Sequence, residues 1–281
     1  MNALTLGLIA ALCWGFHDIC VRFLSQKIPL SACIFTVLMT GLFFHLGLMG
    51  ATNGFAPITT KAFWYSLGAG VFFVIATFGL YHAFARGPVK LVAPLIAAYP
   101  ILSVALATVG GAIITPVQWA AVAAIVAGVA IVAALSDTST DEVPAKAPTI
   151  LFSLIAAVGF AGTFALGQHA SDLSGAMPTT LVTRILTVGL TVVILLAFKL
   201  PFWPGKRALP LLIAMGIADG IALLCVLKAG SLPDPQYAAV TSSMFGLLTI
   251  LLAWLLLKER MSLPQWGGCL VAFCGVGYLA L

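Results

Sequence analysis

Residues 118–133 read QWAAVAAIVAGVAIVA, and residues 265–280, which start 147 positions further along the chain, read QWGGCLVAFCGVGYLA. Both stretches begin with Gln-Trp, place Gly-Val after eight further residues and place Ala after three more. The same shift, without a gap, aligns Pro88 with Pro235. Small apolar residues match easily by chance in an apolar chain, whereas Gln-Trp does not. We therefore interpret the chain as an internal duplication.

The composition places this duplication in a membrane. Hydrophobic residues make up 62% of the 281 residues and charged residues only 7%, whereas a soluble domain has about 45–50% apolar and about 25% charged residues. So few charges cannot cover a surface that faces water, which excludes a soluble enzyme, a disordered segment and a nucleic-acid-binding domain. The remaining class is a polytopic helical membrane protein.

Apolar runs separated by polar residues, Pro or Gly predict ten transmembrane helices. Each run is close to the roughly 20 residues that a helix needs to cross the hydrocarbon layer. Strands of a membrane barrel would be about ten residues long with alternating polarity, and the sequence lacks that pattern. We therefore expect an all-α fold, with helices near 3–23, 32–51, 63–84, 89–111, 116–135, 149–170, 178–198, 208–228, 236–257 and 264–281.

A polar, proline-containing linker at residues 136–148, SDTSTDEVPAKAP, divides these helices into two sets of five. We expect a first repeat at 1–135 and a second at 149–281. Because five is odd, the second repeat starts on the opposite side of the membrane and is inverted relative to the first. Folds of this kind place substrates near the bilayer midplane, between the repeats, so the pattern indicates a transporter.

The net charge of +5 comes from 13 Lys and Arg against eight acids, and the basic residues are scattered, with no run longer than Lys206-Arg207. A nucleic-acid surface would need a basic patch, so we expect no nucleic-acid partner. The six cysteines lie in apolar stretches without a CxxC pair or a Cys/His metal spacing. We expect no metal, no cofactor and no required disulfide.

The first helix carries candidate transport residues at Trp14, His17 and Asp18, whose i+3 and i+4 spacing puts them on one face. Charged side chains inside a bilayer are costly and usually face a cavity or a partner. Asp18 can hold a substrate ammonium group while Trp14 stacks on its side chain. The alternative is an ion pair of Asp18 with Arg22 or with His17.

The third and fourth helices add aromatic and proline candidates. Phe78, Tyr81 and His82 have the same i, i+3, i+4 spacing, although Tyr and His also anchor helices at membrane interfaces. In the fourth helix, Tyr99 lies near the midplane between prolines that free helical carbonyl groups. We expect a kink there and Tyr99 on the substrate path; the alternative is a kink that only shapes packing. The two prolines are Pro94 and Pro100.

Two ionisable residues stand out in the second half. Asp219 lies near the centre of its span between Gly216 and Gly220, where it either couples transport to protons or cations or is a neutral core acid. Arg184 either binds a substrate carboxylate, snorkels or pairs with an acid such as Asp172. His45, Gln168 and His169 lie near span ends, where interface roles are common.

Short motifs make the chain resemble the drug/metabolite transporter superfamily of the EamA type, and within it the bacterial amino-acid exporters of the YddG kind. The motifs are Ala11-x-x-Trp14-Gly15, Pro100, Lys258-Glu259-Arg260 and Gln265-x-x-Gly268. The chain departs from the pattern in having no proline in its ninth helix and in the His17-Asp18 pair that follows Trp14-Gly15.

The resemblance implies a secondary transporter that exports amino acids and related metabolites across a bacterial inner membrane by alternating access. We expect a monomer in the lipid bilayer with a small-molecule substrate. A broad efflux carrier for drugs or cations is the alternative, and a membrane scaffold is a third possibility that the duplication disfavours. The expected cavity lining is aromatic with polar tips: Trp14, Phe78, Tyr81, His82, Tyr99 and Phe164. No nucleophile–base motif or phosphate loop indicates an enzyme.

Orientation stays open at this point. Loops that follow odd-numbered helices carry ten Lys and Arg, whereas the others carry only Lys61 and Lys228. The positive-inside rule alone therefore places both termini outside, whereas members of the family are often drawn with both termini in the cytoplasm.

Overall fold

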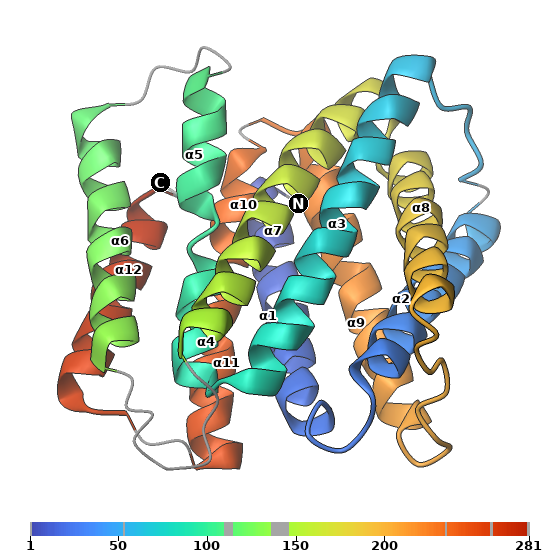
Figure 1. Ribbon diagram of the computed structural model, residues 1–281. Helices are drawn as coiled ribbons and strands as arrows, with labels where there is room; N and C mark the ends of the chain where they lie inside the picture. Colours follow the sequence, from blue (N-terminus) through green and yellow to red (C-terminus); the bar gives the residue numbers. More distant parts are fainter. Residues whose placement is uncertain are drawn as a thin grey trace.

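The computed structural model describes residues 2–52, 54–109, 115–135, 146–233, 235–258 and 261–279, and all regular elements in these ranges are helical (Figure 1). The first half contains α1 (Ala3–Leu24), α2 (Leu30–Ala51), α3 (Thr60–Arg86), α4 (Val89–Ala97), α5 (Pro100–Val109) and α6 (Pro116–Leu135). The second contains α7 (Lys146–Ser174), α8 (Ala176–Ala197), α9 (Leu209–Lys228), α10 (Gln236–Ser242), α11 (Phe245–Leu252) and α12 (Leu263–Leu279), with a 3₁₀ turn at Ala229–Ser231 and a π turn at Ala253–Leu257.

The predicted all-α fold with ten spans is confirmed. Seven of the described spans are at least 18 residues long and apolar enough to cross a membrane, with α10, α11 and the π turn together forming one of them. The shorter apolar stretches Val89–Ser103, in α4 and α5, and Pro116–Val132, in α6, supply two more crossings, and α12 is the tenth helix of the pattern. Helices satisfy their own backbone groups, which is why this architecture suits a chain with so little polar surface. Residues 136–145 of the expected linker lie outside the described part.

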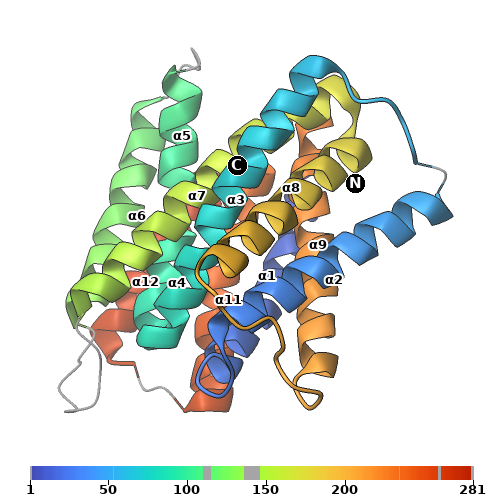
Figure 2. The ribbon, with the colours of Figure 1, turned by 45° about the vertical axis from the view of Figure 1, so that its right-hand side comes forward.

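The halves pack as an inverted pair. The helix α3 packs along α7, and their counterparts α9 and α1 pack together; likewise α2 contacts α9 and α8 contacts α3. The helices on the symmetry axis contact their own counterparts, as α6 and α12 do at one edge of the molecule (Figures 1 and 2). Each contact between the halves is therefore made twice or lies on the axis.

Glycines show the direction of the α6–α12 pair. A β-carbon at Gly128 would lie 2.4 Å from the Gly268 carbonyl oxygen, and one at Gly275 would lie 2.7 Å from the Ala121 carbonyl oxygen. Residue numbers rise on one helix as they fall on the other, so the two helices are antiparallel. The shift of 147 exchanges Gly128 with Gly275 and Ala121 with Gly268, which makes these two contacts the same contact seen from each half.

Both halves contain a broken helix, and the breaks face each other. The first break is the turn at Ala98–Tyr99, with Pro94 inside α4 and Pro100 starting α5. The Tyr99 hydroxyl reaches the Ala239 carbonyl oxygen and the Ser242 hydroxyl beside the second break.

The second break lies between α10 and α11, and no proline marks it. There the hydroxyls of Ser242 and Ser243 donate back to the carbonyl oxygens of Ala239 and Val240, at 2.9 and 2.7 Å. Serine side chains thus satisfy carbonyl groups at a break that the search for prolines does not detect.

Candidate functional site

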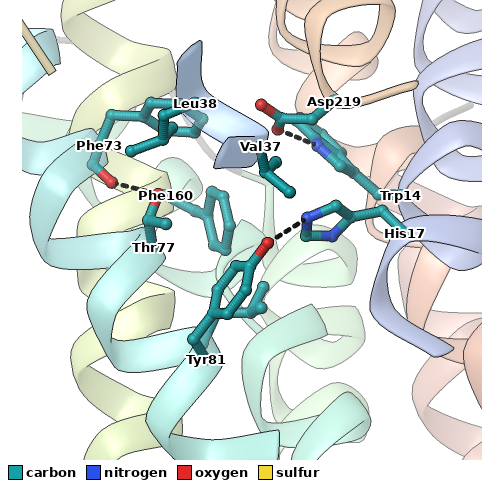
Figure 3. Close-up of a pocket in the computed structure, with 10 residues that line it drawn as sticks. Trp14, His17, Val37, Leu38, Phe73, Thr77, Tyr81, Phe160 and Asp219 are labelled. Atoms are coloured by element: carbon teal, nitrogen blue, oxygen red, sulfur yellow. Dashed lines mark hydrogen bonds between the residues drawn. The ribbon is translucent and has the colours of Figure 1, made fainter. Parts of the chain in front are cut away.

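A small chamber lies where both halves meet near the middle of the bundle (Figure 3). Helices α1, α2, α3, α7 and α9 contribute its walls, which combine aromatic and aliphatic side chains with a few polar tips. Its cavity volume is about 20 Å³, counted as the space that the centre of a water molecule can occupy, which is enough for one water molecule. The lining residues are Trp14, His17, Val37, Leu38, Phe73, Thr77, Leu80, Tyr81, Phe160 and Asp219.

Asp219 is the central acceptor of the chamber. The indole N–H of Trp14 donates to Asp219 Oδ1 at 3.1 Å, and Arg184 Nη1 donates to Oδ2 at 2.7 Å. Gly216 and Gly220 bring α9 close to α2, because a β-carbon at either position would press into Thr40 or Phe44. The predicted helix–helix role of these glycines therefore holds, and Asp219 is ion-paired rather than alone.

Arg184 reaches this acid from α8 while being fully buried. Its guanidinium lies over Gly41 of α2 and sits 4.9 Å from the centre of the Phe73 ring. Its Nε and Nη2 atoms find no hydrogen-bond partner among the described residues. The expectation that Arg184 pairs with an acid is confirmed, but the partner is Asp219 of α9 rather than Asp172, and the fully buried side chain does not snorkel.

A second polar chain lies beside the first. His17 Nδ1 lies 2.9 Å from Asp18 Oδ1, and His17 Nε2 lies 3.1 Å from the Tyr81 hydroxyl. With Nδ1 as the donor, a neutral imidazole accepts the Tyr81 proton at Nε2. Asp18 is buried, and its Oδ2 has no partner in the described part of the chain. Arg22 instead donates to the Phe84 carbonyl oxygen at 2.8 Å, so the alternative of an Asp18–Arg22 ion pair is not observed.

His45 is a buried residue that the sequence placed at an interface. Its Nε2 donates to the Gly220 carbonyl oxygen at 2.8 Å, one residue beyond Asp219. Within the described ranges its Nδ1 has no partner. His45 is buried because α2 crosses α9 here, although Phe43 and Leu46 beside it on α2 are exposed. Only the contact between helices that are distant in sequence reveals this.

An aromatic cluster closes the chamber on the side of α5 and α10. Trp14 stacks on Phe164 with ring centres 5.4 Å apart, and Phe164 lies 5.7 Å from Phe160. Tyr99 packs against Phe164 at 5.3 Å and stacks on Phe245 at 6.5 Å. Beyond this cluster lies an outer pocket of about 210 Å³, which has Phe164, Ala165, Gln168 and Ser103 in its wall. The cluster therefore separates two cavities.

The structure thus gathers the predicted site residues in three places. Trp14, His17, Tyr81 and Asp219 line the chamber, with Asp18 and Arg184 bonded to them. Tyr99 and Phe164 belong to the aromatic cluster instead.

Two further candidates face away from the chamber. His82 Nδ1 donates to the Phe78 carbonyl oxygen at 2.8 Å, and the His82 ring stacks on Phe152 of α7. The predicted cavity role of Phe78 and His82 therefore finds no support in this geometry. Phe73 and Phe160 line the chamber without having been predicted, because apolar residues in an apolar helix carry no distinguishing signal.

These features define a polytopic helical membrane protein whose inverted halves enclose a polar chamber, which is the architecture of a carrier. The model of the EamA-like transporter family matches residues 1–134 and again residues 147–281. The chain therefore belongs to the EamA-like transporter family, within the drug/metabolite transporter superfamily, and is a transporter rather than an enzyme.

One solved structure, described as "Crystal structure of protein", matches with a TM-score of 0.73 at 17% identity. The match covers 99% of this chain and 96% of that one, and it shows the fold. No curated protein matches the chain.

Proposed function

We propose that the protein is a secondary transporter that exports amino acids and related small metabolites across a bacterial inner membrane, as the YddG-like exporters do. The observation that carries this proposal is the fully buried Arg184, which is paired to Asp219 on one edge and has two unpartnered nitrogen atoms among the described residues. A buried guanidinium presents several N–H groups in a fixed plane, which suits a substrate carboxylate.

The rest of the chamber suits the other parts of an amino acid. The free Oδ2 of Asp18 has no partner in the part of the chain that the structure describes, and it can accept from an ammonium group. Trp14, Phe73 and Phe160 supply apolar walls for a side chain. Highly phosphorylated solutes fit less well, because Arg184 is the one Lys or Arg inside the predicted spans at this depth.

Transport in this proposal requires the halves to part. A chamber of about 20 Å³ is too small for an amino acid, so in this proposal it widens when substrate binds. We place the moving units at residues 1–135 and 149–281, with 136–148 as their connection. The breaks at Tyr99 and Ser243 lie where the aromatic cluster would open.

Asp219 is the proposed coupling residue. Its carboxylate bonds to Arg184 Nη1, so a substrate carboxylate at the unpartnered Nε and Nη2 would share the same guanidinium and be repelled by the Asp219 charge. Protonation of Asp219 weakens its bond to Arg184 and frees the guanidinium for substrate. A gradient that changes the protonation of Asp219 therefore changes the affinity for substrate.

The alternative is an efflux carrier for lipophilic cations. Asp219 lines the chamber, and Asp18 contacts His17, which also lines it, so a cationic substrate has two carboxylates near it against one arginine. Such a carrier would need Asp18 or Asp219 but would not need Arg184.

Flux in proteoliposomes separates the two. The protein is reconstituted with labelled phenylalanine or with tetraphenylphosphonium, with and without an imposed pH gradient. The test variant is Arg184→Gln with Asp219→Asn, which removes both charges together, and Asp172→Asn at an exposed position is the control. We expect phenylalanine flux to fall roughly 10- to 100-fold in the double variant, as for loss of charge-assisted hydrogen bonds, and to persist in the control.

Three results would oppose the proposal. Phenylalanine flux equal to wild type in the double variant removes Arg184 from substrate binding. Flux of tetraphenylphosphonium without flux of phenylalanine assigns the alternative function. Asp219→Asn that still binds phenylalanine and keeps full dependence on the pH gradient removes the coupling role of Asp219.

A further inference from the structure

A basic pocket lies at one end of the bundle, away from the chamber. It is formed between the turn that joins α1 to α2 and the loop that joins α8 to α9, both of which lie at the lower end of the molecule in Figure 2. Its volume is about 470 Å³, larger than the outer pocket. It is lined by Leu24, Lys27, Ile28, Pro204, Gly205, Lys206, Arg207 and Ala208.

The two loops are held together, so the pocket is a built feature. The Ser31 hydroxyl donates to the Pro201 carbonyl oxygen at 2.8 Å, and the ring of Phe35 meets that of Phe202 edge to face at 5.0 Å. Gly205 has a φ of 86°, a left-handed conformation that turns the loop back toward α9. These contacts hold the backbone of the two loops that carry the basic side chains.

Positive charge gathers here without an acidic counterpart in the described ranges. Lys27, Lys206 and Arg207 all belong to the lining. The salt bridges His17–Asp18 and Arg184–Asp219 lie at the chamber, away from this pocket. The pocket therefore presents three cations beside an apolar wall that includes Leu24 and Ile28.

Aromatic side chains mark the depth of this pocket in the membrane. Phe198 is 73% exposed and Trp203 is 62% exposed, in the same α8–α9 loop region. On the other side Lys27 Nζ lies 3.6 Å from the centre of the ring of Phe23, which is 45% exposed. Exposed aromatic rings next to basic residues are typical of the interface where lipid headgroups lie.

We propose that this pocket binds the phosphate group of an anionic phospholipid, with Lys27, Lys206 and Arg207 as its ligands. The apolar wall accommodates the first carbons of the acyl chains, which a free phosphate ion does not have. Basic pockets between transmembrane helices at a membrane surface bind such headgroups. The site joins a loop of the first half to a loop of the second half.

Binding of phosphatidylglycerol, measured by native mass spectrometry on protein released from detergent, tests the proposal, with phosphatidylcholine as the neutral lipid. Lys206→Gln with Arg207→Gln removes two ligands. Lys61→Gln with Lys228→Gln removes the same charge at the opposite end of the bundle and serves as the matched control. We expect the pocket variant to bind phosphatidylglycerol roughly thirtyfold more weakly and the control to bind like the wild type.

Competition with inorganic phosphate shows whether the bound phosphate group belongs to a phospholipid or to a free phosphate ion. Retention of phosphatidylglycerol in millimolar phosphate supports a lipid site. Binding of phosphate without preference for phosphatidylglycerol over phosphatidylcholine overturns the lipid assignment. Equal weakening in both double variants overturns the site itself, since it would reflect net charge alone.

Discussion

Replacing Asp219 by Asn tests the ion pair at the centre of the chamber. The change removes the charge that lies 2.7 Å from Arg184 Nη1 and leaves a fully buried guanidinium without its counter-ion. Breaking a buried pair on one side costs about 3–5 kcal/mol. At about 2–4 °C per kcal/mol for a chain of this size, the melting temperature should fall by roughly 6–20 °C.

The measurement is thermal unfolding of the purified protein in one detergent, with four forms compared. They are wild type, Asp219→Asn, Arg184→Gln and the variant with both changes. Neutralising both partners removes the uncompensated charge, so the double variant should melt within a few degrees of wild type. The exposed Asp172→Asn serves as the control and should not shift the melting temperature. Additive losses in the double variant would refute the claim that these two side chains depend on each other.

Two further predictions concern packing between the halves. Gly128→Ala should lower the melting temperature by several degrees, since its β-carbon would press on the Gly268 carbonyl oxygen at 2.4 Å, whereas Gly267→Ala, whose β-carbon would meet no described atom within 4 Å, should not; equal melting of the two variants contradicts the close α6–α12 contact. Tyr99→Phe removes the hydroxyl that reaches Ser242 and should destabilise the protein by about 1–2 kcal/mol in denaturant unfolding. A variant as stable as wild type would show that this hydroxyl does not hold the two broken helices together.

The fold was predictable because the membrane imposes one length on every apolar segment. Runs of about 20 residues and the repeated Gln-Trp block gave ten helices and two related halves, and these are confirmed. The break before Phe245 was not predictable from prolines. It depends on Ser242 and Ser243, whose hydroxyls bond to nearby carbonyls only in the folded helix.

Individual site residues were harder to assign. Helical spacing shows which residues share one face of a helix, but it does not show which other helix packs against that face. Tyr81 and His82 are consecutive and therefore point about 100° apart on α3. The first reaches His17 on α1 and the second stacks on Phe152 of α7. Likewise, nothing in the sequence near Arg184 names Asp219, 35 positions away, as its partner.

The inverted pairing has a consequence for how a solute is oriented. Two identical halves would repeat each ionised group on both sides of the axis, so a molecule could bind equally well in either sense. Here the 147-residue shift places Phe72 opposite Asp219, Val37 opposite Arg184 and Ala165 opposite Asp18. The contacts between helices repeat in the two halves, but the charged side chains do not. A substrate with one positive and one negative group therefore has one preferred orientation in the chamber.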